Sequence, residues 1–336
     1  MSTAPPPPPD ARADTGADDG SIVDVTDLLD PALRPILDSF ELPTIDEEGI
    51  ATLRNIAFPA LDPAAGVVRS EHLVPGAAPD DPPVPVRVYR PAAAEGSLPA
   101  VVTIHGGGYV IGTYDMDGAT LDRWCLELGV VGVSVQYRLA PETPYPGPID
   151  DCYAALQWAY EHAAELGVDR DAIGVYGLSA GGGLAAALAL LARDRGKVPL
   201  AFQLLDCPML DDRGGTPSIR ARGLRMWKAD SNEFGWRSYL GRRYGTDDVP
   251  PYAAAARATD LNGLPPSCIV VGAIDGFRDE DVDYASRLNQ AGVPCELHVI
   301  AGLPHAYLLA PEAPAVQLAE RCKGDWLARQ LARLGA

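Results

Sequence analysis

The sequence predicts an α/β protein in which helices cover both faces of a mostly parallel β-sheet. Two observations carry this prediction: short runs rich in valine, isoleucine and leucine are typical of buried strands, and helical segments separate one run from the next. The expected strands are residues 100–104, 130–135, 173–176, 201–205, 268–271 and 296–300. The expected helices are residues 117–128, 150–164, 182–193, 279–291 and 314–334.

The residues before the first of these strands differ in composition. Residues 1–20, which include the run Pro5 to Pro9, cannot bury enough apolar surface to offset the entropy of ordering, so we expect a disordered tail. Residues 21–60 carry leucine and isoleucine at helical spacing but are interrupted by prolines, which predicts short, broken helices. Two strand-like runs, residues 67–74 and 84–89, flank a turn-rich segment and predict an antiparallel hairpin.

Between Asp206 and about Pro251 the alternation of strands and helices is interrupted. This segment is rich in arginine and aromatic residues, and we expect it to form a helical lid inserted into the sheet domain. The alternation resumes after the insertion, so the residues on both sides of it are expected to belong to one sheet.

Composition limits the classes of function. A chain of 336 residues with 47% hydrophobic content forms one large domain with an accessory element. The net charge of −19 repels phosphate backbones and anionic lipid, so we expect neither a nucleic acid nor a membrane partner. The six cysteines are scattered singly, which predicts small buried residues in a reducing, cytoplasmic compartment and no metal site. The sequence leaves open whether the chain forms a homodimer.

Ser179 lies between a short apolar strand and an alanine-rich helix, with Gly177 and Gly181 two positions away on either side. This pattern is typical of a nucleophile elbow, a tight strand-to-helix turn that exposes the serine hydroxyl and tolerates only small neighbours. The same pattern arises where a serine caps a glycine-rich helix, so by itself it leaves both interpretations open. A catalytic role requires further groups elsewhere in the chain.

A catalytic serine needs a histidine to accept its proton and a carboxylate to orient that histidine. Among the five histidines, His162 lies on an expected helix and His298 inside an expected strand. His305 instead follows the last expected strand in a loop, where parallel sheets place their functional groups. His305 is therefore the candidate base.

Two aspartates compete for the role of the acid, because both lie between the serine and the histidine in the chain. Asp275 is the first carboxylate after the strand at residues 268–271, and Asp206 ends the preceding strand. We favour Asp275, because its strand is expected to adjoin the strand that leads to His305.

His105 and Tyr109 flank three consecutive glycines directly after the strand at residues 100–104. Residues without side chains let backbone N–H groups approach a ligand closely, so this loop can stabilise the oxyanion that forms when a serine attacks a carbonyl. A phosphate-binding loop is the alternative. It is disfavoured because no Gly-Lys-Ser/Thr follows and the Gly-x-Gly-x-x-Gly spacing is absent.

Together these motifs resemble those of the hormone-sensitive lipase-like (bacterial family IV) esterases of the α/β-hydrolase fold. The resemblance extends from about residue 60 to the C-terminus, and it includes the run Tyr137 to Glu142 with Pro146 and Asp151 downstream. It implies a mostly parallel eight-stranded sheet flanked by helices, with a helical cap over the site. The cap corresponds to residues 21–60 and 207–250, and the catalytic domain to residues 61–206 and 251–336.

By position, the resemblance implies that Ser179 is the nucleophile, Asp275 the acid and His305 the base. His105 would support the glycine loop without taking part in proton transfer. The implied oxyanion hole consists of backbone amides, those of Gly107, Gly108 and Ala180. The candidate walls of the substrate pocket are aromatic or methionine residues: Tyr109, Met226, Trp227, Phe234 and Trp236. These aromatic residues could equally hold the cap together.

The chain departs from the family pattern at three places, Leu178, Gly276-Phe277 and Ala306-Tyr307, and none of them removes a reacting group. The resemblance implies a serine carboxylesterase that hydrolyses short- to medium-chain esters through an acyl-enzyme, with no cofactor and no metal. An amide, lactone or carbamate would use the same groups, so these substrates stay open. A non-catalytic small-molecule receptor is the remaining alternative, and the presence of all three triad residues disfavours it.

Overall fold

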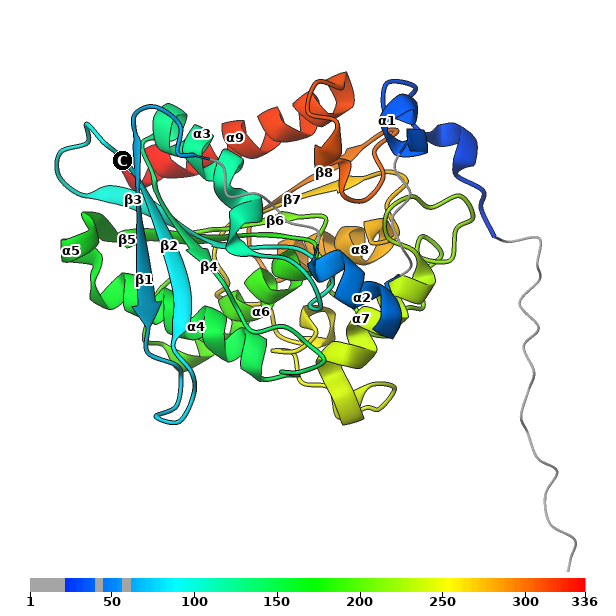
Figure 1. The fold of residues 1–336 in the computed structure, drawn as a ribbon, viewed down its shortest axis with the longest axis horizontal. Coiled ribbons are helices and arrows are strands. Elements are labelled where there is room, and N and C mark those ends of the chain that lie inside the picture. The colour runs from blue at the N-terminus through cyan, green and yellow to red at the C-terminus, as the bar shows by residue number, and fades with distance from the viewer. Residues whose placement is uncertain (1–21, 40–44, 56–61, 336) are drawn as a thin grey trace, which may run out of the picture.

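The computed structural model describes residues 22–39, 45–55 and 62–335 and has an eight-stranded sheet at its centre (Figure 1). The strands are β1 (Val67–Val74), β2 (Val84–Pro91), β3 (Leu98–Ile104), β4 (Val131–Val135), β5 (Val168–Leu178), β6 (Gln203–Asp206), β7 (Ser267–Gly272) and β8 (Cys295–Ile300). Their order is β1-β2-β4-β3-β5-β6-β7-β8. β2 is antiparallel to both of its neighbours, and the other pairs are parallel. The predicted sheet is confirmed, while the predicted tail at residues 1–20 lies outside the described residues.

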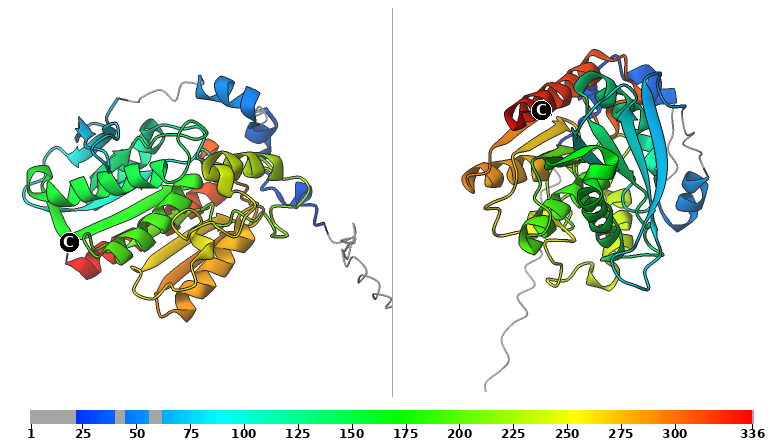
Figure 2. Two further views of the ribbon diagram at one scale, coloured as in Figure 1. Left: turned by 90° about the horizontal axis from the view of Figure 1, so that it is seen from below. Right: turned by 90° about the vertical axis from the view of Figure 1, so that its left-hand side faces the viewer.

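Helices cover both faces of the sheet (Figure 2). One face carries α3 (Gly118–Leu128) and α9 (Pro314–Leu334), and the other carries α4 (Gly147–Glu161), α6 (Ala180–Arg195) and α8 (Arg278–Gln290). Alternate residues of β3 serve the two faces, because Val101 packs in the core beside α3 and α9 and Val102 in the core beside α4, α6 and α8. No helix in the described part of the chain is both long and apolar enough to cross a membrane.

The insertion after β6 contains less helix than the sequence analysis predicted. Within residues 207–250, α7 (Ala229–Leu240) is the α-helix, followed by the short 3-10 turn η4 (Gly241–Arg243), and residues 207–228 are irregular. Gly214 and Gly223 have positive φ angles of 57° and 80° there, which interrupts helical backbone. This irregular part contacts the N-terminal region, since the N–H of Val25 donates to the carbonyl of Arg222 over 2.9 Å.

The N-terminal region forms the short helices α1 (Arg34–Ser39) and α2 (Glu47–Arg54), as its proline-interrupted pattern predicted. The Asp46 side chain caps α2 by accepting the N–H of Gly49 over 2.7 Å. At the other end, Arg54 donates to the carbonyls of Val110 and Ala140, each over 2.7 Å, and pairs with Glu142. Arg54 therefore fixes α2 to the loops that follow β3 and β4.

His105 begins the loop after β3, and its side chain is wholly buried. Its ring stacks on Tyr137 with 4.2 Å between centroids, and its Nδ1 lies 2.8 Å from the carbonyl oxygen of Gly106. The Tyr137 hydroxyl donates to the carbonyl of His105 over 3.0 Å. Burial lowers the pKa of His105 to about 4, so the folded protein holds this ring neutral at neutral pH.

This buried ring makes stability depend on pH. Because the pKa of His105 in the fold lies below its ordinary value of 6.5, the unfolded chain takes up the proton first as pH falls. The contribution of the neutral ring to the free energy of unfolding is complete above pH 6.5. It is lost as the pH falls towards 4, and the free energy of unfolding decreases by about 3 kcal/mol in total. In urea unfolding across this window, His105→Asn should lose less stability than the wild type by about that amount. Parallel curves for the two proteins would contradict the prediction.

Candidate active site

Ser179 lies in a tight turn between β5 and α6, with φ of 59° and ψ of −121°. A Cβ on Gly177 would lie 2.1 Å from the carbonyl oxygen of Gly181, and a Cβ on Gly181 would lie 1.9 Å from that of Ile104. Both glycines are therefore required by the close approach of backbone to backbone. The N–H of Ser179 donates to the carbonyl of Asp206 over 2.8 Å, which joins the turn to β6.

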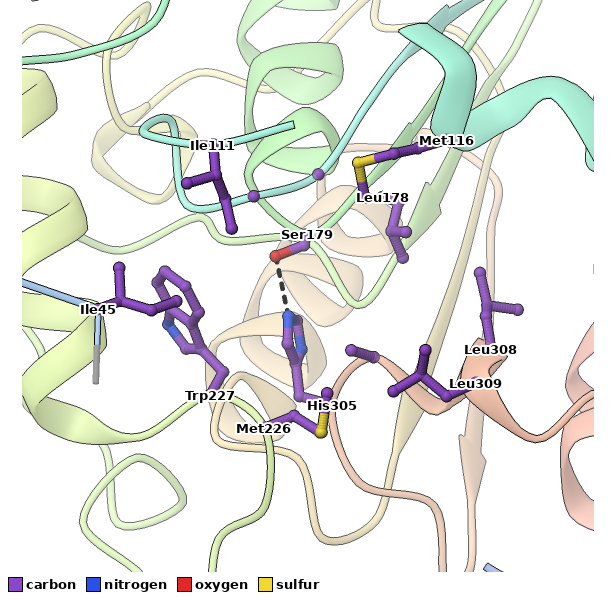
Figure 3. A pocket seen from close by; sticks show the side chains of 13 residues that line it. Ile45, Ile111, Met116, Leu178, Ser179, Met226, Trp227, His305, Leu308 and Leu309 are labelled. Atoms are coloured by element: carbon purple, nitrogen blue, oxygen red, sulfur yellow. Dashed lines mark hydrogen bonds between the residues drawn. The ribbon is translucent and has the colours of Figure 1, made fainter. Parts of the chain in front are cut away.

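The structure brings Ser179, His305 and Asp275 together in one chain of hydrogen bonds (Figure 3 shows the first of them). The Ser179 Oγ lies 2.8 Å from Nε2 of His305, and Nδ1 of His305 lies 2.8 Å from Oδ2 of Asp275. The other carboxylate oxygen of Asp275 accepts the N–H of Phe277 over 2.9 Å. All three side chains are buried, at 5%, 4% and 1% exposed. This geometry allows the histidine to accept the hydroxyl proton while the carboxylate holds the ring.

The alternative acid, Asp206, faces other partners. Its carboxylate accepts hydrogen bonds from Tyr307, Tyr176 and Lys323. Of the other histidines, His298 lies in β8 and bonds Glu296 over 2.7 Å, as its place inside an expected strand suggested. The geometry thus favours Asp275 over Asp206.

The glycine loop after β3 lies beside the serine, because Gly106, Gly107 and Ser179 line the same cavity. Gly107 has φ of 115°, and a Cβ there would lie 2.1 Å from the carbonyl oxygen of Ile111. Gly108 has φ of 59° and lies against the indole ring of Trp227. Within the described residues, the backbone N–H groups of Gly107, Gly108 and Ala180 have no hydrogen-bond acceptor, so they can bind an oxyanion.

The run Tyr137 to Glu142, which contributed to the family resemblance, supports this loop from behind. The N–H of Ala140 donates to the carbonyl of Tyr109 over 2.9 Å. Arg138 donates to both carboxylate oxygens of the wholly buried Asp151. A buried carboxylate needs such a partner, and the pair fixes the start of the run next to α4.

A cavity of about 270 Å³ opens above Ser179 and His305. Apart from these two residues its walls are glycine and apolar side chains. The other lining residues are Ile45, Gly106, Gly107, Ile111, Met116, Leu178, Met226, Trp227, Ala306, Leu308 and Leu309. Met116, Leu178, Leu308 and Leu309 lie to one side of Ser179, and Ile45, Ile111 and Trp227 to the other (Figure 3). The cavity therefore offers an apolar wall on each side of the nucleophile.

Of the five residues predicted for the pocket, Met226 and Trp227 line the cavity, and Tyr109, Phe234 and Trp236 do not. Tyr109 and Trp236 are each 1% exposed and pack in the core around Tyr239, with Tyr109 stacked on Tyr239 at 4.1 Å. Sequence reasoning missed the aliphatic residues of the wall. Leu178 precedes Ser179 and Leu308 follows His305 by three positions, so their closeness to the reacting residues in sequence was an available signal.

Cys207 adds a thiol beside the histidine and the carboxylate. One donor atom from each of Cys207, Asp275 and His305 lies within 4.8 Å of the others, which is the type of ligand set that holds zinc. However, both ring nitrogens of His305 are already engaged with Ser179 and Asp275. Burial also raises the pKa of Cys207 well above its ordinary value, which disfavours the thiolate that a metal requires. The arrangement suits proton transfer better than metal binding.

Several proteins similar to this chain are named esterases. Residues 101–309 match a family model described as an α/β hydrolase fold. Carboxylesterase NlhH of Mycobacterium tuberculosis is 37% identical over 287 residues, which cover 83% of this chain and 89% of that protein. Esterase LipI of the same organism is 34% identical over 293 residues, which cover 83% of this chain and 88% of that protein.

Solved structures give the same result. A bacterial heroin esterase superposes with a TM-score of 0.83 at 39% identity, covering 91% of this chain and 99% of that one. Esterase LipW from Mycobacterium marinum superposes with a TM-score of 0.81 at 36% identity, covering 93% and 99%. The chain therefore belongs to the α/β-hydrolase fold family, among the hormone-sensitive lipase-like esterases that its motifs predicted.

Proposed function

We propose that this protein is a serine carboxylesterase that hydrolyses esters through an acyl-enzyme formed on Ser179. The observation that carries the proposal is the pair of 2.8 Å hydrogen bonds that joins Ser179 to His305 and His305 to Asp275. Ester hydrolysis is the activity named for the relatives NlhH and LipI and for the superposed structures, which supports the same reaction class here.

The reaction proceeds in two halves. The Ser179 Oγ attacks the ester carbonyl carbon while Nε2 of His305 takes its proton, and Asp275 stabilises the resulting imidazolium through Nδ1–H. The negative oxygen of the tetrahedral intermediate accepts hydrogen bonds from the backbone amides of the oxyanion hole, those of Gly107, Gly108 and Ala180. His305 then gives the proton to the leaving alcohol as the carbon–oxygen bond breaks. Water repeats the sequence on the acyl-enzyme and releases the acid.

Residues 21–60 and 207–250 act as a cap that determines which esters enter. Ile45 comes from the first segment, Met226 and Trp227 come from the second, and all three line the cavity beside Ser179. An apolar cavity of about 270 Å³ favours esters with short to medium acyl chains over long ones. An amide, lactone or carbamate that fits the same space would use the same reacting groups.

The cytoplasm is the compartment that fits the cysteines. All six are free thiols, four of them buried and two partly buried, without a disulfide among them in the described chain. A reducing compartment maintains thiols in this state.

Labelling by a fluorophosphonate tests whether Ser179 is a nucleophile. The wild type should lose activity with one phosphonate bound per chain, and mass spectrometry of peptides should place it on Ser179. Ser179→Ala should remain unlabelled and inactive, whereas Ser134→Ala, which replaces a buried strand serine, should still be labelled. A wild type that takes up no label while keeping its fold would favour the receptor alternative.

Replacing the acid tests its role in orienting the histidine. Asp275→Asn should lower kcat by about 10³- to 10⁴-fold, because the amide stabilises neither the required tautomer nor the imidazolium. Asp279→Asn is the matched control: it lies four residues further along and pairs with Arg278 rather than with His305. Steady-state hydrolysis of p-nitrophenyl butyrate measures both. Equal losses in the two variants would remove Asp275 from the mechanism.

The cavity size predicts the preferred acyl chain. Across p-nitrophenyl esters of increasing length, kcat/KM should peak between butyrate and octanoate and fall by dodecanoate. Leu308→Ala should move the peak to longer chains, because each newly buried methylene contributes about 0.8 kcal/mol, about fourfold in kcat/KM. Leu318→Ala, on the exposed side of α9, should leave the profile unchanged. Rates that climb steadily past dodecanoate in the wild type would contradict the short-chain assignment.

A further inference from the structure

Asp206 joins the elements that carry the reacting groups, although it does not contact them with its side chain. It ends β6 and is wholly buried. Its backbone carbonyl accepts the N–H of Ser179 over 2.8 Å. Its carboxylate accepts the hydroxyl of Tyr307 at Oδ1, and Lys323 and the hydroxyl of Tyr176, the latter over 3.3 Å, at Oδ2. One residue thus connects the serine turn, the histidine loop and α9.

The charge of this carboxylate is balanced inside the protein. Lys323 is also wholly buried, and it forms a second ion pair with Glu320, which Arg123 contacts in turn. Burial opposes the positive charge of Lys323, but Asp206 and Glu320 outweigh it and raise the pKa of Lys323 above its ordinary value. A buried carboxylate paired with a cation is a strong hydrogen-bond acceptor, so its hydrogen bond from Tyr307 is expected to be strong.

The loop that carries His305 depends on side chains for its position. Within the described residues, the backbone of residues 304–306 makes no hydrogen bond to a neighbouring element. Ala306 has φ of 53°, a left-handed conformation that is unfavourable for alanine. On one side of it His305 bonds Asp275, and on the other Tyr307 bonds Asp206. The two side chains hold the unfavourable backbone between them.

We propose that Tyr307 and Asp206 are positioning residues that keep His305 aligned with Ser179 and Asp275. The Tyr307 hydroxyl fixes the loop two residues after the histidine by donating to the Asp206 carboxylate. The backbone carbonyl of Asp206 accepts the N–H of Ser179, so the same residue connects the histidine loop to the serine turn. Lys323 supplies the countercharge that lets Asp206 remain buried beside the site. This inference rests on the proposed function, because it requires His305 to act as the base.

A purely structural ion pair between β6 and α9 is the alternative. That pair needs Asp206 and Lys323, and it would gain little from a hydroxyl on the histidine loop. Tyr176 separates the two interpretations, because it bonds the same carboxylate but belongs to β5, whose backbone is held on both sides by β3 and β6. Loss of either hydroxyl leaves Asp206 with one hydrogen bond fewer, but only Tyr307 carries the histidine loop.

The experiment compares Tyr307→Phe with Tyr176→Phe, using p-nitrophenyl butyrate. Tyr307→Phe should lower kcat by about tenfold with a smaller change in KM, because proton transfer by His305 tolerates less displacement than the apolar contacts of the cavity wall. It should slow fluorophosphonate labelling of Ser179 to the same extent. Tyr176→Phe should keep the wild-type kcat and labelling rate while its Tm falls as much as that of Tyr307→Phe. Equal kcat values for the two variants, at any Tm, would overturn the proposal.

Two further measurements keep the test decisive. If Tyr307→Phe does not fold, the double variant Asp206→Asn with Lys323→Gln removes the buried charges at similar volume. It should lower kcat at constant KM, and a wild-type kcat would overturn the proposal. The controls from the proposed function separate the two failures. If the triad itself is wrong, the wild type resists fluorophosphonate and Asp275→Asn stays active. If only the positioning role is wrong, both controls behave as expected and Tyr307→Phe turns over like the wild type.

Discussion

The contact between Gly181 and the carbonyl of Ile104 is the constraint on which the site depends. It brings the first turn of α6 against the end of β3, so close that a methyl group at Gly181 would lie 1.9 Å from the carbonyl oxygen. Because β3 and β5 are neighbours in the parallel sheet, this contact places Ser179 beside the glycine loop that follows β3. Ser179 and the glycine loop come from segments about 70 residues apart, and this close backbone packing brings them together.

Several carboxyl groups are buried in the interior around the site. Their negative charge is limited in two ways, by pairing with cations and by raised pKa values. Asp151, Asp206 and Asp212 are buried with Arg138, Lys323 and Arg257 as their respective partners. Glu280 and Asp281 are buried without a cationic partner in the described chain, and burial raises the pKa of each well above its ordinary value. Burial therefore favours the protonated form of both carboxyls.

Sequence reasoning found the parts of the site that obey local rules. The strands could be predicted because apolar runs in a parallel sheet are continuous. Ser179, Asp275 and His305 could be predicted because functional groups follow the carboxyl ends of such strands. The pocket was harder to predict, because its walls come from distant segments and the sequence does not show which of these segments contact one another. Tyr109 and Trp236 are residue types that often form pocket walls, but here they pack into the core around Tyr239. The irregular backbone of residues 207–228 follows from glycine conformations that no apolar periodicity records.

Trp227 contacts both the cavity and the glycine loop. Its indole ring is a wall of the cavity, and it also covers Gly108, where a Cβ would lie 2.0 Å from the ring. The cavity proposed to select the substrate and the loop proposed to stabilise its reacting oxygen therefore share one side chain. A smaller side chain at position 227 would enlarge the cavity, and it would also leave the loop at Gly108 less tightly packed. Under the proposed function, a change at Trp227 would alter selectivity and turnover together. A change in the apolar wall on the other side of Ser179, formed by Met116, Leu178, Leu308 and Leu309, would alter selectivity alone.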